Sequence, residues 1–599
     1  MSIHVMSEQL ASQIAAGEVV ERPFSVVKEL VENAIDAGAT NVSIEVREGG
    51  RKMIQIADNG EGIASQEIET AFLRHATSKL YTANDLNDIR TLGFRGEALA
   101  AIAAVSQLTI VSRSAADSGG TRLVMEAGHK RSRETVGAPQ GTVIAVENLF
   151  YNMPARLKFL KSVSTEKRLI DEFVTRYALA YPEIRFRLTH NGRITFQSSG
   201  NGSLLDVLVA VYGPENGRQL LPIGGQDSAG GGERPDGRGA IPVTGYVGPP
   251  SMHWANRNHI TLFVNGRWIK DSSLSYAVIQ AYHTLLPTGR YPMGIVFFNV
   301  PTDEIDVNVH PAKTEVRFRD RNAIFSAVQR AVRQTLVTDS PIRSMGAWET
   351  SSYGDEAASN WAGKLDHTAF TRREGDSQSK LELDWSQPST GTQPATMPPQ
   401  PANLGGGQLP IMRVVGQVGT AYIITEGPEG IFLIDQHAAH ERILYEQFMA
   451  EWDGERVISQ GLVAGAAAHL TPSQATLLEE YLDLLTRIGF QIEPFGPNAF
   501  MVRAIPAILA KRDPVQGLLS VLEDLEREDT PLQGKIEDKI ITRVCKTAAV
   551  KAGQTLTLAE MEAMIRQLEA CRSPHTCPHG RPTLIHLSVA QLARQFGRT

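Results

Sequence analysis

The chain has 599 residues, enough for about three to five domains. Its 42% hydrophobic and 21% charged residues are ordinary for globular protein and exclude a wholly disordered or fibrous chain. Its 59 Lys and Arg against 66 Asp and Glu give a net charge of -7, so any contact with nucleic acid is expected from local basic patches rather than from bulk charge.

The first predicted elements are one helix and two strands. Apolar residues recur at helical spacing over residues 25–36, and alternation predicts strands at 42–47 and 52–57. Glu29 and Asn33 stand four residues apart and therefore share one face of the helix. A carboxylate there can orient a water molecule, and an amide oxygen can bind Mg²⁺. A solvated helix face is the commoner meaning of such a pair.

The second strand runs into Asp58-Asn59-Gly60-Glu61-Gly62. An Asp at a strand end can accept a hydrogen bond from an exocyclic amine, and the two glycines let the backbone approach a flat ligand. The same residues also fit an ordinary turn.

Two further segments extend this pattern. Residues 75–79 read HATSK, and residues 93–99 read GFRGEAL and lead into an Ala-rich helix. A glycine-rich loop before a helix offers free N–H groups and a favourable dipole to phosphate. Gly141-Thr142 precedes another strand. The order ExxxN, DxGxG, GxRGxxL and GT indicates an ATP site, although the P-loop pattern GxxxxGK[ST] is absent.

The middle of the chain indicates a second unit and a linker. Strands predicted at 185–190 and 262–264 indicate a second α/β unit that begins around Ile184. The Gly-rich run 224–239 is interpreted as a mobile hairpin insertion without chemistry. Residues 341–410 contain no Val and a single Ile, so they cannot bury enough apolar area to offset chain entropy. The expected domains are 1–215 and 216–340, followed by a flexible linker at 341–410 and a last domain at 411–599.

A second polar pattern follows the linker. A strand predicted at 430–434 runs into Asp435, and His437 and Glu441 follow it one helical turn apart. Carboxylate and imidazole on one helical face suit Zn²⁺ or Mn²⁺, although a plain surface helix also fits DxHxxxE. Cys577 and His579 add a thiol and an imidazole in a Pro- and Gly-rich turn, which favours a metal site.

The chain has only three cysteines, Cys545, Cys571 and Cys577. They cannot form a disulfide framework, which favours a reducing compartment. Cys571 fits a buried structural thiol best. No run of about 18 apolar residues and no signal-peptide pattern occurs, so we expect a cytoplasmic, nucleoid-associated protein without a membrane span.

Taken together, these motifs resemble the GHKL ATPase superfamily and, within it, the endonuclease-bearing type of the MutL family of DNA mismatch repair proteins. The resemblance covers roughly residues 1–335 and resumes after the linker. It implies an α/β (α+β) chain with a GHKL ATPase sandwich, a transducer-like α/β domain, and a C-terminal α/β dimerisation and endonuclease domain. Its segments are QIAAGEVVERPFSVVKELVENAIDAGAT (13–40), GFRGEAL (93–99), NLFYNMPARLKFL (148–160), FVNGRWI (263–269), NVHPAKTEVRF (308–318), DQHAAHERILYE (435–446), CKTAAVK (545–551), CPHGRP (577–582) and FGR (596–598).

For the first part of the chain, the resemblance implies an ATP site with Mg²⁺. Glu29 is the implied general base, Asn33 the implied Mg²⁺ ligand, and Asp58 the implied reader of adenine, supported by Thr142. Lys313 is implied to reach the γ-phosphate from the second domain and so to sense ATP against ADP. The other implied nucleotide contacts are Gly60, Gly62, Thr77, Ser78, Lys79, Gly93, Arg95, Gly96 and Leu99.

For the last part of the chain, the resemblance implies metal-dependent nicking of DNA. Asp435 and Glu441 are the expected catalytic residues, and Arg581 is expected to steady the scissile phosphate. One metal is expected to be structural Zn²⁺ and another a transient Mn²⁺ or Mg²⁺. His440 receives no role. The implied metal ligands are Asp435, His437, Glu441, Cys545, Cys577 and His579.

The implied assembly is a homodimer that pairs residues 1–20 when ATP is bound and encloses double-stranded DNA. The other implied partners are a MutS-type mismatch recognition protein and the replication sliding clamp. The nearest clamp-binding candidate, residues 460–465, lacks the expected Pro and also fits a plain β segment at 458–464. Basic residues between 156 and 168 fit DNA phosphate contact or a solvated helix face.

Two alternatives stay open. The first is an ATP-switched clamp that recruits other repair enzymes without cutting DNA, which the intact DQHAAHERILYE and CPHGRP segments disfavour. The second is another GHKL machine such as a topoisomerase subunit, for whose catalytic tyrosine domain no residues argue.

Overall fold

The computed structural model describes most of the chain, and no helix in that part is long and apolar enough to cross a membrane. The predicted linker and Gly-rich insertion lie outside the described residues except at their ends. The described residues are 16–17, 19–79, 82, 89, 91–93, 96–224, 241–287, 289–306, 316–338, 409–454, 457–526, 536–550, 554–596 and 598.

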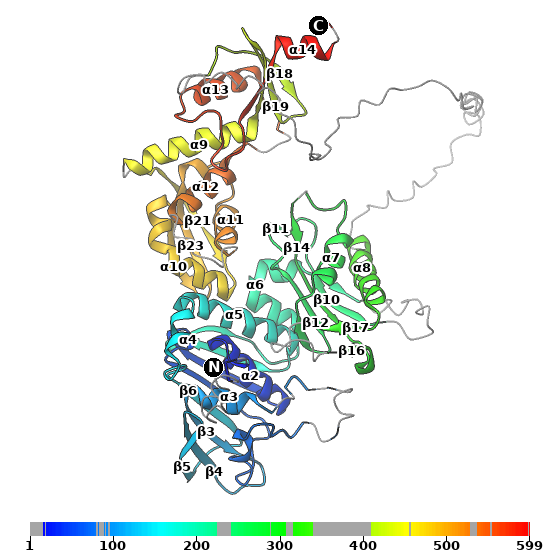
Figure 1. Ribbon diagram of the computed structural model, residues 1–599, viewed down its shortest axis with the longest axis vertical. Helices are drawn as coiled ribbons and strands as arrows, with labels where there is room; N and C mark the ends of the chain where they lie inside the picture. The colour runs from blue at the N-terminus through cyan, green and yellow to red at the C-terminus, as the bar shows by residue number, and fades with distance from the viewer. Residues whose placement is uncertain are drawn as a thin grey trace, which may run out of the picture. The chain divides into compact units, whose positions relative to one another are not determined.

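Eight strands form the first sheet, in the order β5-β4-β3-β6-β2-β1-β7-β8 (Figure 1). The strands are β1 (Asn41–Arg47), β2 (Met53–Asp58), β3 (Gln107–Arg113), β4 (Gly120–Glu126), β5 (His129–Val136), β6 (Gly141–Glu147), β7 (Arg185–His190) and β8 (Arg193–Gln197). The accompanying helices are α2 (Pro23–Asp36), α3 (Ala98–Ala104), α4 (Pro154–Phe159), α5 (Val163–Ala180) and α6 (Leu204–Gln219).

Helix α2 is the helix predicted at residues 25–36, and it begins two residues earlier. Pro23 stands in its first turn, where a missing N–H removes no helical hydrogen bond. The apolar stripe that includes Val27 and Leu30 is buried in the core that α2 shares with the sheet. Burial of this stripe fixes the rotation of α2 and leaves Glu29 and Asn33 half-buried.

The predicted start of the second unit around Ile184 is wrong. The strand at 185–190 has the predicted bounds, but β7 pairs in parallel with β1 and so belongs to the first sheet. The second sheet begins with β9 and has the order β13-β12-β15-β10-β9. Its strands are β9 (Leu221–Ile223), β10 (Val243–Val247), β12 (Ile260–Val264), β13 (Arg267–Ile269) and β15 (Gly294–Phe298).

Helices α7 (Ser272–Ala281) and α8 (Arg321–Thr338) pack together and share the core of this second sheet. Two small pairs accompany it, β11 (His253–Trp254) with β14 (Tyr291–Pro292) and β16 (Ile305–Asp306) with β17 (Arg317–Phe318). The mixed α/β class expected from the sequence is therefore confirmed for the N-terminal part.

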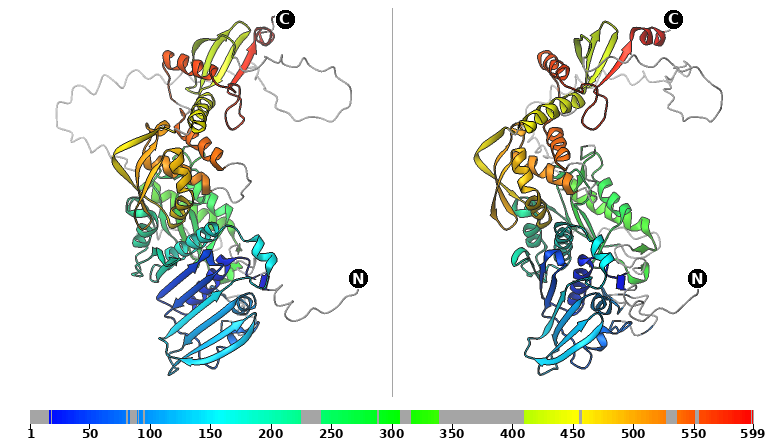
Figure 2. Two further views of the ribbon diagram at one scale, coloured as in Figure 1. Left: turned by 90° about the vertical axis from the view of Figure 1, so that its left-hand side faces the viewer. Right: turned by 60° about the vertical axis from the view of Figure 1, so that its left-hand side comes forward.

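The C-terminal part contains two sheets, of order β18-β19-β20-β24 and β21-β23-β22. Helix α9, yellow in Figure 2, follows β20 directly and packs against α12 and α13. The predicted strand at 430–434 is β20, and the β segment predicted at 458–464 lies in β21 except for its first residue. The elements are β18 (Arg413–Val418), β19 (Tyr422–Gly427), β20 (Gly430–Asp435), α9 (Gln436–Asp453), β21 (Ser459–His469), α10 (Pro472–Ile488), β22 (Gln491–Gly496), β23 (Ala499–Pro506), α11 (Pro514–Glu526), α12 (Ile536–Ala548), α13 (Leu558–Glu569), β24 (Leu584–Ser588) and α14 (Val589–Gln595).

Candidate functional site

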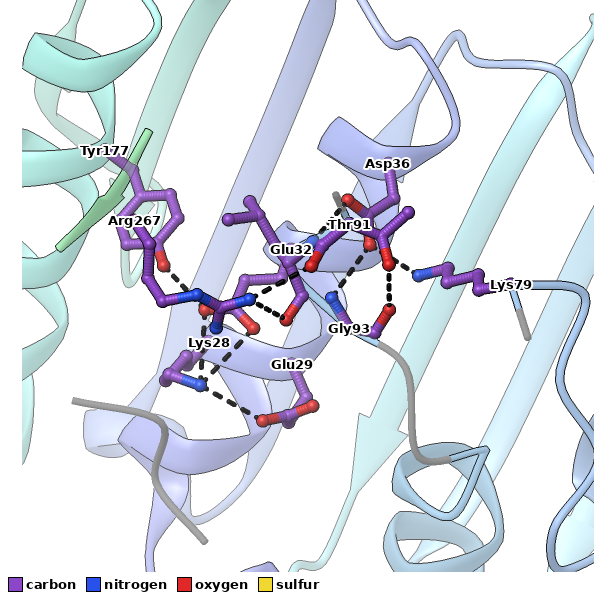
Figure 3. Close-up of polar contacts among 10 residues, drawn as sticks. Lys28, Glu29, Glu32, Asp36, Lys79, Thr91, Gly93, Tyr177 and Arg267 are labelled. Atoms are coloured by element: carbon purple, nitrogen blue, oxygen red, sulfur yellow. Dashed lines mark hydrogen bonds and ion pairs between the residues drawn. The ribbon is translucent and has the colours of Figure 1, made fainter. Parts of the chain in front are cut away.

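A chain of buried polar contacts leads to Glu29 on α2 (Figure 3). The Lys28 ammonium lies 3.1 Å from a carboxylate oxygen of Glu29 and 3.2 Å from one of Glu32. The Tyr177 hydroxyl of α5 donates to Glu32 at 2.6 Å. Burial alone would lower the pKa of Lys28, but the Glu32 and Glu29 carboxylates outweigh that effect and hold the pKa above its usual value. Glu29 thereby lies next to a fixed cation.

One turn further along α2, oxygen atoms hold a second cation. The Lys79 ammonium donates to Asn33 Oδ1 at 3.0 Å and to Asp36 Oδ2 at 2.5 Å. Asp36 also accepts hydrogen bonds from the backbone N–H groups of Leu92 and Gly93, each at 2.9 Å. The predicted residues Asn33, Lys79 and Gly93 are therefore close together, and Asp36 joins them.

Asp58 ends β2 with its carboxylate fixed by backbone N–H groups. It accepts from Gly60 N–H at 2.9 Å, and Thr142 N–H is a further backbone donor to it. Burial raises the pKa of Asp58 despite these two hydrogen bonds. The Thr142 hydroxyl lies 2.9 Å from that of Ser112, whose oxygen accepts from Ile63 N–H. Thr142 thus supports Asp58 through its own backbone N–H. Through Ser112 it also supports the turn that follows Asp58.

Two glycines of the predicted site occupy conformations that other residues rarely adopt. Gly62 has φ of 74° and Gly96 has φ of 64°. A Cβ atom at Gly62 would stand 2.1 Å from the carbonyl oxygen of Arg113, and one at Gly96 would stand 2.5 Å from that of Ala76. Both glycines are required by close backbone approach.

The other nucleotide residues predicted from the sequence are placed less centrally. Thr77 Oγ1 accepts from the N–H of Lys79 at 3.1 Å, and Ser78 is exposed. Leu99 is half-buried and packs against the apolar core. Arg95 and Lys313 lie outside the described residues.

The C-terminal candidate centre is a carboxylate between imidazoles and a thiol. Glu441 is 1% exposed, and its two oxygens lie 3.1 Å from His437 Nε2 and 3.2 Å from His579 Nδ1. One ligand atom each from Glu441, Cys577 and His579 lie within 4.8 Å of one another. Burial would raise the pKa of Glu441, but His437 and His579 outweigh it and lower that pKa.

Local structure explains how these ligands meet. His437 and Glu441 are one turn apart on α9. Cys577 N–H donates to the carbonyl of Arg581, and Gly580 N–H donates to the carbonyl of Cys577, so a tight turn presents the thiol. Gly580 has φ of 80°, which explains a glycine at that position.

The remaining C-terminal candidates lie around this group. The Asp435 carboxylate caps α9 by accepting from the N–H groups of His437 and Ala438 at 2.9 and 3.0 Å. Cys545 is fully buried on α12, and burial followed by the charge of Glu441 raises the pKa of its thiol. His440, unassigned from the sequence, accepts from Val550 N–H at 2.9 Å, and burial lowers its pKa to about 4.

Two other predicted groups have identifiable contacts. The Arg156 guanidinium donates to the carbonyl of Val20 at 2.8 Å, so it holds the described end of the N-terminal segment. Arg168 lies 3.8 Å from Glu172 on the same helix. Cys571 is buried and donates weakly to the carbonyl of Gln567 at 3.4 Å, as expected of a structural thiol.

Sequence reasoning missed several polar residues of the first site. Lys28 carried a signal, because it is a charged residue next to the apolar stripe of an amphipathic helix. Asp36 was visible as a polar residue of that helix, but its role depends on contacts with residues far along the chain. Tyr177 carried no local signal, and Arg267 lies in the FVNGRWI segment but received no role.

Three family models match the chain. Residues 21–148 match the model described as Histidine kinase-, DNA gyrase B-, and HSP90-like ATPase. Residues 208–337 match DNA mismatch repair protein, C-terminal domain. Residues 415–556 match MutL C terminal dimerisation domain.

Similar proteins span the whole chain. A DNA mismatch repair protein MutL of Desulforudis audaxviator is 38% identical over 599 residues, covering 100% of this chain and 99% of that protein. One of Symbiobacterium thermophilum is 36% identical over 644 residues, covering 100% of both chains. Among solved structures, the Aquifex aeolicus MutL ATPase domain complexed with ADP is 27% identical, with a TM-score of 0.35, and the match covers 47% of this chain and 93% of that one.

Proposed function

The chain belongs to the MutL family of DNA mismatch repair proteins, and we propose that it couples ATP turnover in its N-terminal part to metal-dependent nicking of DNA by its C-terminal part. The observation that carries the nicking is the group of Glu441, Cys577 and His579, whose ligand atoms lie within 4.8 Å of one another. The chain contains a GHKL ATPase domain and a MutL dimerisation domain.

The residues of the first site fit Mg²⁺ and ATP. Asn33 and Asp36 offer hard oxygen atoms that already hold the Lys79 ammonium, so the donor set suits a cation. In the proposed reaction Glu29 orients the attacking water as general base, and Asp58 accepts from the adenine amine. Mg²⁺, when bound, neutralises charge on the phosphates. Lys313 is proposed to sense the γ-phosphate.

The C-terminal group fits a transition metal. A buried thiol, two imidazoles and a carboxylate form the mixed N, S and O donor set that Zn²⁺ and Mn²⁺ sites use. Cys577 and His579 are the proposed holders of Zn²⁺, together with Glu441 and His437. A bound metal supplies a polarised phosphate and a deprotonated water at neutral pH. Asp435 and Cys545 are the proposed further ligands, and Arg581 is proposed to hold the phosphate.

An apolar sheet face supports a homodimer. Pairing places Ile424 opposite Leu433 and Leu433 opposite Ile585, so these residues share one face of the four-stranded sheet. Ile585 is 56% exposed, and on the same face Tyr422 is 50% and Val418 is 53% exposed. A sheet face of this composition normally packs against another surface. A second copy of the chain is the proposed cover.

The remaining partners are proposed from family membership. They are double-stranded DNA, a MutS-type mismatch recognition protein and the replication sliding clamp. Residues 1–20 are proposed to pair between subunits when ATP is bound, and Arg156 supports this by fixing Val20.

The test is nicking of supercoiled plasmid with Mn²⁺, comparing the parent with Asp435→Asn and Glu441→Gln. Asn also caps helices, so Asp435→Asn should leave α9 folded. Asp453→Asn is the matched control, because Asp453 is exposed at the other end of α9. We expect nicking by the parent and the control and none by the other two variants.

Failure of the metal-loaded parent to nick would favour the ATP-switched clamp that recruits other enzymes. Equal nicking by Asp435→Asn, Glu441→Gln and the parent would remove these residues from the reaction. The ATPase is tested separately with Glu29→Ala, which should bind ATP but not turn it over.

A further inference from the structure

Residues 91 and 92 directly precede the glycine-rich segment of the nucleotide site, and Gly93 begins it. One side chain from α2 and one from β13 hold the backbone of these three residues (Figure 3). On α2, Asp36 accepts from the N–H groups of Leu92 and Gly93. On β13, Arg267 Nη2 donates to the carbonyl oxygens of Thr91 and Leu92, each at 3.0 Å. One side chain fixes the N–H groups of this backbone and the other fixes its carbonyl groups.

A rigid hairpin presents Arg267. Asn265 and Gly266 form the two-residue turn between β12 and β13, with φ of 48° and 76°, which is the type I′ geometry that Asn-Gly favours. The Asn265 side chain donates to the carbonyl of Val300 at 2.8 Å and accepts from its N–H at 2.9 Å. A Cβ atom at Gly266 would stand 2.7 Å from the Tyr181 hydroxyl oxygen. Arg267 follows this confined turn and is 5% exposed.

Arg267 also lies near the polar group that holds Glu29. Its positive charge opposes the rise that burial causes in the pKa of the Tyr177 hydroxyl. That hydroxyl donates to Glu32. The Lys28 ammonium contacts both Glu32 and Glu29. Arg267 Nη1 is buried and has no hydrogen-bond partner among the residues that the structure describes. A buried donor without a partner costs stability, so the presence of Arg267 here is explained better by positioning than by stability.

We propose that Arg267 is a positioning residue for ATP turnover. It fixes the backbone of residues 91–93 and so holds the second sheet in a fixed position relative to Glu29 and its polar neighbours. The inference deepens the proposed function, because it rests on residues 93–99 binding the nucleotide. A guanidinium suits this task, since its Nη2 carries two N–H groups in a fixed plane, and these donate to the two carbonyl groups. An ammonium keeps the charge but does not hold its N–H groups in a fixed plane.

The experiment compares full-length Arg267→Gln and Arg267→Lys with the parent. Arg333→Gln is the matched control, because Arg333 Nη1 donates to two carbonyl groups, those of Ala281 and His283, within the second unit. Amide hydrogen exchange of peptides that contain Leu92 and Gly93 reports the backbone directly. ATP turnover gives kcat and KM.

In Arg267→Gln the Leu92 and Gly93 amides should exchange about tenfold faster, while peptides of the first sheet stay unchanged. The kcat should fall about 10- to 100-fold, because small misplacement of a reacting group has effects of that size. Arg267→Lys should recover part of both losses, and Arg333→Gln should match the parent.

Equal kcat in Arg267→Gln and Arg333→Gln would overturn the inference. A uniform rise in exchange across the first sheet in both Arg267 variants would also overturn it, because Arg267 would then act as a general stabiliser. A parent without ATP turnover would contradict the proposed function instead, and the exchange comparison at Leu92 and Gly93 would still decide whether Arg267 fixes this backbone.

Discussion

Replacement of Lys28 by Met should break the buried charge group on α2 while keeping the length of the side chain. Lys28 is 5% and Glu32 is 1% exposed, and the ammonium lies 3.1 and 3.2 Å from Glu29 and Glu32. Removal of one partner from such a buried pair costs about 3–5 kcal/mol. The lower limit applies here, because the Tyr177 hydroxyl still donates to Glu32. A loss of about 3 kcal/mol corresponds to about 150-fold faster amide exchange in α2.

Hydrogen exchange of peptides from α2 measures this loss locally, which suits a chain of several domains. Lys28→Met/Glu32→Gln removes both charges, and its exchange should return to within about tenfold of the parent. Lys52→Met is the control, because Lys52 and Glu48 form an exposed pair at 3.7 Å that should contribute almost nothing. ATP turnover should stay low in both Lys28 variants, since Glu29 has lost its fixed cation.

Exchange of Lys28→Met within about threefold of the parent would contradict this prediction, because the buried pair would then contribute less than about 1 kcal/mol. Full ATP turnover in the double variant would also contradict it, because Glu29 would then be positioned without Lys28.

Two further predictions concern single carboxyl groups. Asp58→Asn should weaken ATP and ADP binding equally, by about 10- to 100-fold, since a charged acceptor for the adenine amine is lost; titration with a fluorescent nucleotide measures this, and unchanged affinity would remove Asp58 from the site. Glu166→Gln should raise the thermal unfolding temperature at pH 8 and have little effect near pH 4, because burial raises the pKa of Glu166 and penalises only its ionised form. A gain that grows toward low pH would contradict this sign.

Local periodicity predicted the bounds of the helices and strands that carry the site better than it predicted which strands pair with each other. The helix at 25–36 and the strands at 42–47, 52–57 and 430–434 agree with α2, β1, β2 and β20 within two residues. The strand at 185–190 also agrees with β7, but its assignment to a second unit was wrong. Burial of one face sets a strand locally, whereas parallel pairing of β7 with β1 joins segments far apart in the sequence.

The C-terminal group around Glu441 likewise combines one contact that local sequence spacing predicted with one that it could not predict. Helical spacing alone brought His437 to Glu441, as the structure has them. No spacing rule could bring His579 to Glu441, because the two residues are 138 positions apart. Resemblance to a family supplied that link, and the tight turn that ends at Gly580 gives it a physical basis.

The polar residues of α2 fall into two rows, and this arrangement gives the buried charge pair a role beside the proposed ATP site. Lys28 and Glu32 are four residues apart and form one row, which the Tyr177 hydroxyl of α5 holds. Glu29, Asn33 and Asp36 form the neighbouring row, which carries the proposed base and cation ligands. Buried ion pairs are weak stabilisers compared with apolar packing, but they tolerate few geometries. Because both rows belong to one rigid helix, the row that contacts α5 sets the rotation of the row that is proposed to face the nucleotide. Lys28 then acts on Glu29 twice, by direct contact and by fixing the helix that carries it.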